Sequence, residues 1–94
     1  MKVIWSASAV RQLQEVVDYL QDESAARAVT IRRRILATVG LIGQMPDSGR
    51  TGRIDGTREA VVPRSPYIVV YQVSTETVEV LGVWHAAREW PEAL

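Results

Sequence analysis

The sequence predicts one α+β domain over residues 1–94, in which an N-terminal strand and an antiparallel two-helix hairpin precede a three-stranded antiparallel meander that forms one sheet. Apolar residues recur at helical spacing in the first half of the chain. The second half carries short runs of β-branched and aromatic residues between turn residues. With 94 residues, of which 47% are hydrophobic, the chain can close one core but is too short for two domains.

Residues 2–5 are β-prone, and we expect them to form the first strand. Either Ser6 or Ser8 can cap the helix that follows, because a serine hydroxyl accepts a hydrogen bond from a free backbone N–H at a helix start. The apolar stripe of this helix consists of Val10, Leu13, Val17 and Leu20. About three polar residues, ending at Ser24, are expected to connect it to a second helix.

The second helix is predicted from another apolar face, which consists of Ala28, Ile31, Ile35, Val39 and Ile42. We expect Val29 and Leu36 to broaden this face. Arg32 lies inside the broadened arc, so its charge should extend to solvent or pair with an acid of the first helix or of a partner. Gly43 is the expected C-terminal cap, and Pro46 prevents the helix from continuing.

Residues 44–57 have the glycine, proline and aspartate content of a loop. Three short strands are expected after it, over residues 58–63, 67–73 and 78–84. Alternation along the strands predicts which face the helices cover. Gln72 and Glu79 are better tolerated in solvent, so the covered side should carry Tyr67, Val69 and Tyr71. The opposite side would then expose an apolar patch that suits a protein partner and consists of Ile68, Val70, Leu81 and Val83.

Composition excludes several classes of site. The chain has no cysteine, so disulfides, thiolate catalysis and cysteine-ligated zinc are excluded, and its one histidine, His85, cannot form a multi-histidine metal site. We therefore expect no metal and no cofactor. The N-terminus does not resemble a signal peptide, and no apolar run approaches the roughly 20 residues of a membrane span. The expected location is the cytoplasm, without a membrane partner.

A series of motifs runs through nearly the whole chain in a characteristic order. The motifs are Trp5-Ser6 at the end of the first strand, Leu20 near the end of the first helix, Met-Pro-Asp-Ser-Gly-Arg at 45–50, Gly-Thr-Arg-Glu at 56–59, Pro-Tyr-Ile-Val-Val-Tyr at 66–71 and Val-Trp-His-Ala-Ala-Arg-Glu-Trp-Pro at 83–91. Together they resemble the RelE/ParE superfamily of toxins from bacterial type II toxin–antitoxin systems. The resemblance implies a cognate antitoxin encoded by an adjacent gene, and contact with operator DNA only through that antitoxin.

The resemblance leaves two activities open. RelE-like members cut mRNA on the ribosome, whereas ParE-like members poison DNA gyrase. RelE-like toxins typically carry an arginine in a Tyr-Arg-x-x-Tyr pattern, and here Ile68 takes its place in Tyr67-Ile68-Val69-Val70-Tyr71. An isoleucine cannot stabilise the charge of a pentavalent phosphate. The substitution therefore favours the ParE-like activity.

A nuclease assignment would still have candidate residues. Glu59 could act as the base and His85 as the acid, with Arg58, Arg64 or Arg88 holding the phosphate. Alternation along a strand places Arg58 and Glu59 on opposite faces, so both cannot line one site unless the strand begins later. A formal net charge of zero also gives little support for docking on ribosomal RNA.

The sequence thus predicts a toxin that inhibits growth by poisoning DNA gyrase and that its antitoxin neutralises. The alternatives are a ribosome-dependent mRNA endoribonuclease and a non-toxic family member that only binds the antitoxin. The expected target-binding residues are Arg58, Arg64, His85, Arg88 and Trp90. For Trp90 the competing interpretation is that it anchors the tail onto the domain. The expected antitoxin-binding residues are Arg32, Ile68, Val70, Leu81 and Val83.

Overall fold

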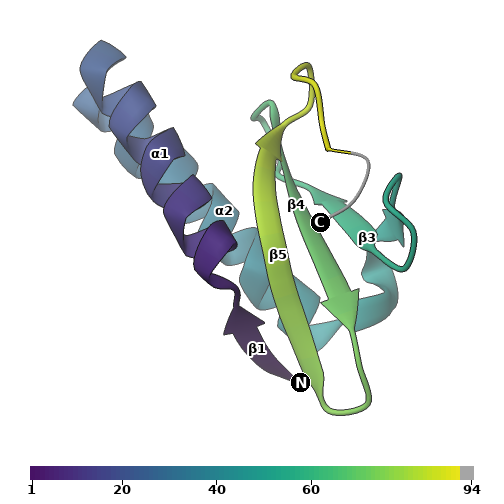
Figure 1. The fold of residues 1–94 in the computed structure, drawn as a ribbon. Coiled ribbons are helices and arrows are strands. Elements are labelled where there is room, and N and C mark those ends of the chain that lie inside the picture. The colour runs from purple at the N-terminus through teal and green to yellow at the C-terminus, as the bar shows by residue number, and fades with distance from the viewer. Residues whose placement is uncertain (92–94) are drawn as a thin grey trace.

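The computed structural model describes residues 1–91 and confirms the α+β architecture, with two helices packed on one sheet (Figure 1). The elements in chain order are β1 (Lys2–Trp5), α1 (Ala7–Glu23), α2 (Ala25–Gln44), a short 3-10 turn η1 (Pro46–Ser48), β2 (Arg50–Thr51), β3 (Arg58–Val61), β4 (Tyr67–Val73) and β5 (Thr77–His85). None of the helices within residues 1–91 is long and apolar enough to cross a membrane.

The sheet contains the predicted antiparallel meander of β3, β4 and β5, but it is larger than expected. Its five strands lie in the order β1-β5-β4-β3-β2. The N-terminal strand β1 pairs in parallel with β5, and the two-residue β2 pairs antiparallel with β3. The sheet is therefore mixed, and the helical hairpin connects its two edge strands, β1 and β2.

The helix ends are set by two serines. The hydroxyl of Ser6 accepts a hydrogen bond from the backbone N–H of Ala9 at 3.0 Å, so Ser6 rather than Ser8 caps α1. The hydroxyl of Ser24 accepts from the backbone N–H of Arg27 at 3.2 Å and caps α2. Ser24 is also the C-cap of α1, so one residue joins the two helices instead of the expected three.

Gly43 does not end the second helix as predicted. It lies inside α2, whose C-cap is Met45. A Cβ atom at Gly43 would come within 2.9 Å of the Val3 side chain, and the terminal amine of Met1 donates a hydrogen bond to the Gly43 carbonyl at 2.8 Å. The absence of a side chain at Gly43 therefore allows β1 to approach α2 closely.

The core lies between the helices and the covered face of the sheet. The five apolar residues predicted for the α2 face are all buried in it. Val10, Val29 and Leu36 are instead 54%, 56% and 37% exposed, so the predictions that they belong to the buried faces were wrong. Each helix buries a narrower stripe, because Ala9 on α1 and Thr38 on α2 take the positions against the rest of the fold.

The predicted orientation of β4 is confirmed, since Tyr67, Val69 and Tyr71 belong to the core. The assignment of faces in β5 was correct only for its first half. Val70 pairs with Gly82 while Tyr71 pairs with Val80, so Leu81 is an extra residue in a β-bulge. Beyond this bulge the alternation is inverted, and Val83 points into the core.

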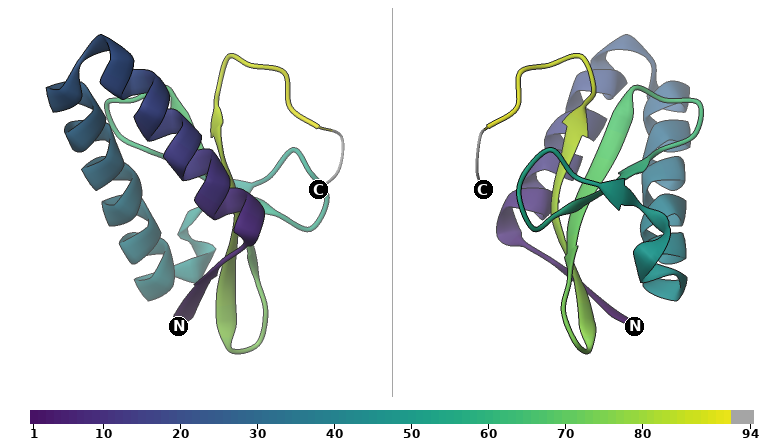
Figure 2. Two further views of the ribbon diagram at one scale, coloured as in Figure 1. Left: turned by 60° about the vertical axis from the view of Figure 1, so that its left-hand side comes forward. Right: turned by 90° about the vertical axis from the view of Figure 1, so that its right-hand side faces the viewer.

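The predicted exposed patch does not exist in this conformation. Ile68, Val70 and Val83 are buried, and Leu81 is half-buried. Val83 points into the core, and Ile68 and Val70 face the opposite side of the sheet. On that side lie the loop between β2 and β3 and the tail over residues 86–91 (Figure 2). Ile54 of that loop is itself buried. The expectation that these four side chains form an open antitoxin surface is therefore wrong for the described structure.

Candidate functional site

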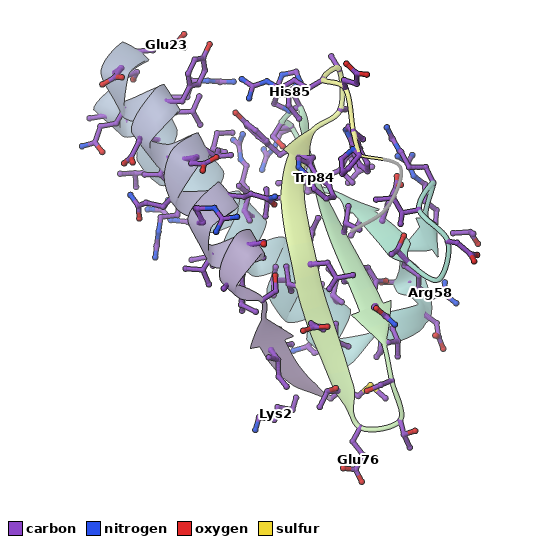
Figure 3. The ribbon with its side chains drawn as sticks, viewed as in Figure 1. Lys2, Glu23, Arg58, Glu76, Trp84 and His85 are labelled. Atoms are coloured by element: carbon purple, nitrogen blue, oxygen red, sulfur yellow. The ribbon has the colours of Figure 1, made fainter. Side chains whose placement is uncertain are left out.

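A cleft of about 260 Å³ opens between α1 and the ends of β4 and β5. The α1 side contributes Gln12, Glu15, Val16 and Tyr19, and the sheet side contributes Tyr67, Val83, Trp84, His85 and Arg88. Figure 3 shows His85 and Trp84 at the end of β5 far from Glu76, which marks the β4–β5 hairpin. Two of the predicted target-binding residues, His85 and Arg88, are thus brought together in one cleft.

His85 is held in a defined orientation. Its Nδ1 accepts a hydrogen bond from the backbone N–H of Ala87 at 3.1 Å, so Nε2 carries the proton in the neutral imidazole. The ring lies edge-on to Tyr67 with centroids 5.6 Å apart. The carbonyl of His85 accepts from the backbone N–H of Arg88 at 3.1 Å. His85 therefore offers a single ring N–H donor to a ligand.

Aromatic rings and the guanidinium group of Arg88 line the cleft. The guanidinium carbon of Arg88 lies 5.7 Å from the centroid of the exposed Tyr19 ring, a weak cation–π contact. Burial raises the pKa of the Tyr67 hydroxyl, and the positive charge of Arg88 partly opposes this. The cleft thus presents the Tyr67 hydroxyl, the positive charge of Arg88 and the carboxylate of Glu15, which are groups that can bind a polar partner.

A second cluster on the opposite face surrounds Glu59, whose side chain is only 2% exposed. Arg50 donates to Oε1 from Nη2 at 2.9 Å and from Nε at 3.2 Å. Arg53 donates to Oε2 from its backbone N–H at 2.8 Å and from Nε at 3.2 Å. Burial alone would raise the pKa of Glu59, but these hydrogen bonds outweigh it and hold the pKa below its ordinary value.

Trp90 packs against this cluster. The guanidinium carbon of Arg53 lies 3.4 Å from the centroid of the Trp90 ring, and the Trp84 ring lies 5.2 Å away from it. The indole Nε1 of Trp90 donates to the His85 carbonyl at 3.1 Å. These contacts occupy the ring with partners from its own chain. They support the interpretation of Trp90 as an anchor of the tail rather than as a stacking surface for a base.

The remaining arginines predicted for function have separate places. Nη1 of Arg58 donates to the carbonyls of Asp47 at 3.2 Å and Gly49 at 2.8 Å, which fastens η1 to β3. Arg64 is exposed in the turn before β4, with a φ of 54°, and its carbonyl accepts from Nη1 of Arg34 at 2.9 Å. Arg32 is exposed on α2 and does not lie in a buried arc.

The candidate nuclease residues are not brought together. Glu59 pairs with Val70 on the outer face, whereas His85 pairs with Tyr67 on the helix side. The prediction that Arg58 and Glu59 point to opposite faces is confirmed, because Arg58 pairs with the core residue Tyr71. A base at Glu59 and an acid at His85 therefore cannot act on one phosphate in this conformation.

Sequence reasoning missed half of the cleft. Gln12, Val16 and Tyr19 lie at spacings of four and three residues and share one side of α1, but only Val16 is apolar, so the stripe was not visible. The carbonyl of the Gln12 side chain accepts from the backbone N–H of Val83 at 2.9 Å, next to the β-bulge.

Within residues 1–91 no group of three histidine, cysteine, aspartate or glutamate residues is arranged to hold a metal ion.

Comparison with known proteins agrees with this architecture. The sequence model of the ParE toxin of the type II toxin–antitoxin system parDE matches residues 3–90. Y4kP of Sinorhizobium fredii, provisionally named a toxin, is 38% identical over 93 residues, which is 99% of this chain and 96% of that protein. Toxin RelE2 of Caulobacter vibrioides is 28% identical over 87 residues, covering 93% and 97% of the two chains.

A solved structure shares the fold. A chain of the chromosomal ParDE toxin–antitoxin system of P. aeruginosa superposes with a TM-score of 0.84 and covers 90% of this chain and 95% of its own length. Its sequence is 19% identical, so this likeness concerns the fold. The family match extends over nearly all of the described residues. The chain therefore belongs to the ParE toxin family of type II toxin–antitoxin systems.

Proposed function

We propose that this toxin inhibits growth by poisoning DNA gyrase through protein–protein contact at the end of the molecule that carries His85, Arg88 and the tail. The observation that carries the proposal is the state of Glu59. A general base must reach the proton that it removes. Glu59 is buried, bound by two arginines and on the face of the sheet opposite His85. Ile68 adds no charge that could stabilise a phosphate.

We propose that the accessible polar side chains of the cleft contact the target. Arg88 is exposed and has no carboxylate partner within residues 1–91, and Tyr19 lies beside it with an exposed ring. Arginine and tyrosine are enriched among residues that dominate protein interfaces. Arg58 binds the carbonyls of Asp47 and Gly49, and Arg64 lies in the β3–β4 turn outside the lining of the cleft, so they are secondary candidates.

The antitoxin surface is proposed to lie on α2. This helix carries Arg27, Arg32, Arg33 and Arg34 and no acidic residue. Val29 and Leu36 are exposed on the same helix. An amphipathic, acidic segment of the protein encoded by the adjacent gene fits this combination. Arg32→Glu should weaken the complex in a binding titration, whereas Lys2→Glu on β1 should not.

The deciding experiment compares the two targets with one protein preparation. Purified toxin is added to a gyrase supercoiling and DNA-cleavage assay, and to a translation reaction in which mRNA ends are mapped. We expect cleaved DNA to accumulate with gyrase and mRNA to stay intact. Arg88→Ala should reduce gyrase poisoning, and Arg33→Ala, an exposed arginine on α2, should not. Codon-phased mRNA cuts that disappear in His85→Ala or Glu59→Ala would establish a nuclease instead.

A further inference from the structure

Two segments that are distant in the sequence meet on the outer face of the sheet. The loop over residues 52–57 and the tail after β5 both lie on the side opposite the helices (Figure 2). Glu59 of β3 is buried on this face, in register with Val70. Within residues 1–91 no backbone hydrogen bond joins the loop to the tail over residues 86–91, so side chains hold these two segments together.

The contacts form a continuous chain from Glu59 to the tail. A single carboxylate oxygen, Oε2, accepts from both the backbone N–H and the Nε of Arg53. Glu59 therefore fixes the backbone and the side chain of Arg53 together. The guanidinium that is fixed in this way lies 3.4 Å from the centroid of the Trp90 ring. A planar cation at this distance over an indole is an attractive cation–π contact.

The other attachments of Trp90 come from β5 and do not depend on Glu59. The indole N–H donates to the carbonyl of His85, and the ring packs on Trp84. Arg88 lies between these residues in the sequence, with its backbone N–H bound to the same His85 carbonyl. Arg88 is therefore part of a segment whose outer end, at Trp90, is held against the loop by Arg53.

We propose that Glu59 is a positioning residue for the C-terminal tail, holding Arg53 against Trp90 and so fixing how Arg88 is presented to the target. The target part of this inference rests on the proposed function, since it takes Arg88 as a contact residue. The role differs from that of a general base, which would require the carboxylate to be accessible. Here the carboxylate acts through Arg53 and touches no substrate.

The test observes Trp90 directly. The chain contains three tryptophans, Trp5, Trp84 and Trp90. Labelling with 5-fluorotryptophan gives each a separate ¹⁹F resonance, assigned with tryptophan-to-phenylalanine variants. E59Q and R53K should each move the Trp90 resonance toward that of a solvated indole, with about a fivefold change in the ratio of docked to undocked tail. The Trp5 resonance, in β1, reports whether the whole domain stays folded.

A matched control distinguishes loss of the Glu59–Arg53–Trp90 contacts from any change at an arginine that binds Glu59. Arg50 also binds Glu59, through Oε1, but it has no stacking contact with Trp90. R50K should therefore leave the Trp90 resonance in place. If E59Q moves the Trp5 resonance as well, the fold has been disturbed and R53K decides the question, because it retains the positive charge but loses the planar group. An unmoved Trp90 resonance in folded R53K, or an equal movement in R50K, would overturn the proposal.

The gyrase assay provides an independent arm. If wild-type protein poisons gyrase, E59Q and R53K should lower its potency in the same order in which they undock Trp90, and R50K should not. A wild-type protein without effect on gyrase, combined with the expected ¹⁹F shifts, would reject the proposed target and leave the tail-positioning role of Glu59 supported. Full potency in a variant whose tail is undocked would reject the positioning role alone.

Discussion

At the scale of single residues, the charge of Glu59 is a stabilising interaction that depends on pH. The folded state holds its pKa below the ordinary value of 4.5, so the unfolded state binds more protons in the window between the two values. The contribution is complete above that ordinary value and is lost as pH falls through the folded pKa. We expect the free energy of unfolding, measured by urea melts between neutral pH and about pH 3, to fall less steeply in Glu59→Gln than in the wild type.

A matched variant at another glutamate separates the effect of Glu59 from that of removing any carboxylate. Glu79 lies on β5 and is exposed. Glu79→Gln should keep the wild-type pH dependence, because its carboxylate has no ion pair among the described residues. Identical pH profiles for wild type and Glu59→Gln would show that the arginine contacts of Glu59 do not stabilise the folded state.

Tyr71 combines burial with two hydrogen bonds. Its hydroxyl donates to the Pro46 carbonyl at 2.7 Å and accepts from the Gly49 backbone N–H at 2.9 Å, which fixes η1 against β4. Tyr71→Ala should cost about 3–5 kcal/mol of unfolding free energy, and Tyr71→Phe about 1–2 kcal/mol. Gln72→Ala should stay within about 0.5 kcal/mol, because Gln72 is exposed. A larger loss of unfolding free energy in Gln72→Ala than in Tyr71→Ala, measured by chemical denaturation, would contradict the assigned sheet faces.

At the scale of elements, the helical hairpin depends on one residue. Ser24 ends α1 through its backbone N–H, bound to the Leu20 carbonyl at 2.8 Å, and begins α2 through its hydroxyl. Ser24→Ala removes the side-chain cap and should cost about 1 kcal/mol in a thermal melt. Ser8 lies inside α1 and caps nothing, so Ser8→Ala should have almost no effect. Equal losses in the two variants would argue against the capping role.

The elements that the sequence predicted well are those with a repeating pattern. The helices and the meander follow from apolar periodicity, and the buried face of α2 from the regular spacing of Ile31, Ile35 and Ile42. The β-bulge at Leu81 could not be predicted, because alternation assumes that no residue is inserted. The burial of Ile68 and Val70 was also missed, because the loop and tail on that side of the sheet are irregular and carry no period.

The same limit applies to the site. His85 and Arg88 were both predicted as target-binding residues, and they line the same cleft. The pairing of Glu59 with Arg50 and Arg53 depends on how the loop folds back over β3, which residue types alone do not determine. Glu59 was therefore a plausible base in the sequence and is an anchored ion in the structure.

At the scale of the whole molecule, a net charge of zero conceals two oppositely charged helices. α1 carries Glu15, Asp18, Asp22 and Glu23 against one arginine, whereas α2 carries four arginines and no acid. The cleft lies on the α1 side, and the proposed antitoxin surface lies on α2. The two proposed surfaces therefore lie on different helices, and within the cleft the proposed contact is the exposed cation Arg88.

Substitutions at two tail residues test whether the target surface and the antitoxin surface are separate, because the two variants should lose toxicity for different reasons. Trp90 is half-buried against Arg53 and Trp84, so Trp90→Ala should lower the unfolding free energy by about 2 kcal/mol and the Tm by roughly 10 °C. Arg88 is exposed, so Arg88→Ala should keep the wild-type Tm. Both variants should restore growth when the toxin is expressed alone, Trp90→Ala through lost stability and Arg88→Ala through the lost target contact.

Because α2 is untouched, Arg88→Ala should still bind the antitoxin with wild-type affinity. An equal loss of Tm in the two variants would remove Arg88 from the target surface, and a loss of antitoxin binding in Arg88→Ala would show that the two surfaces overlap.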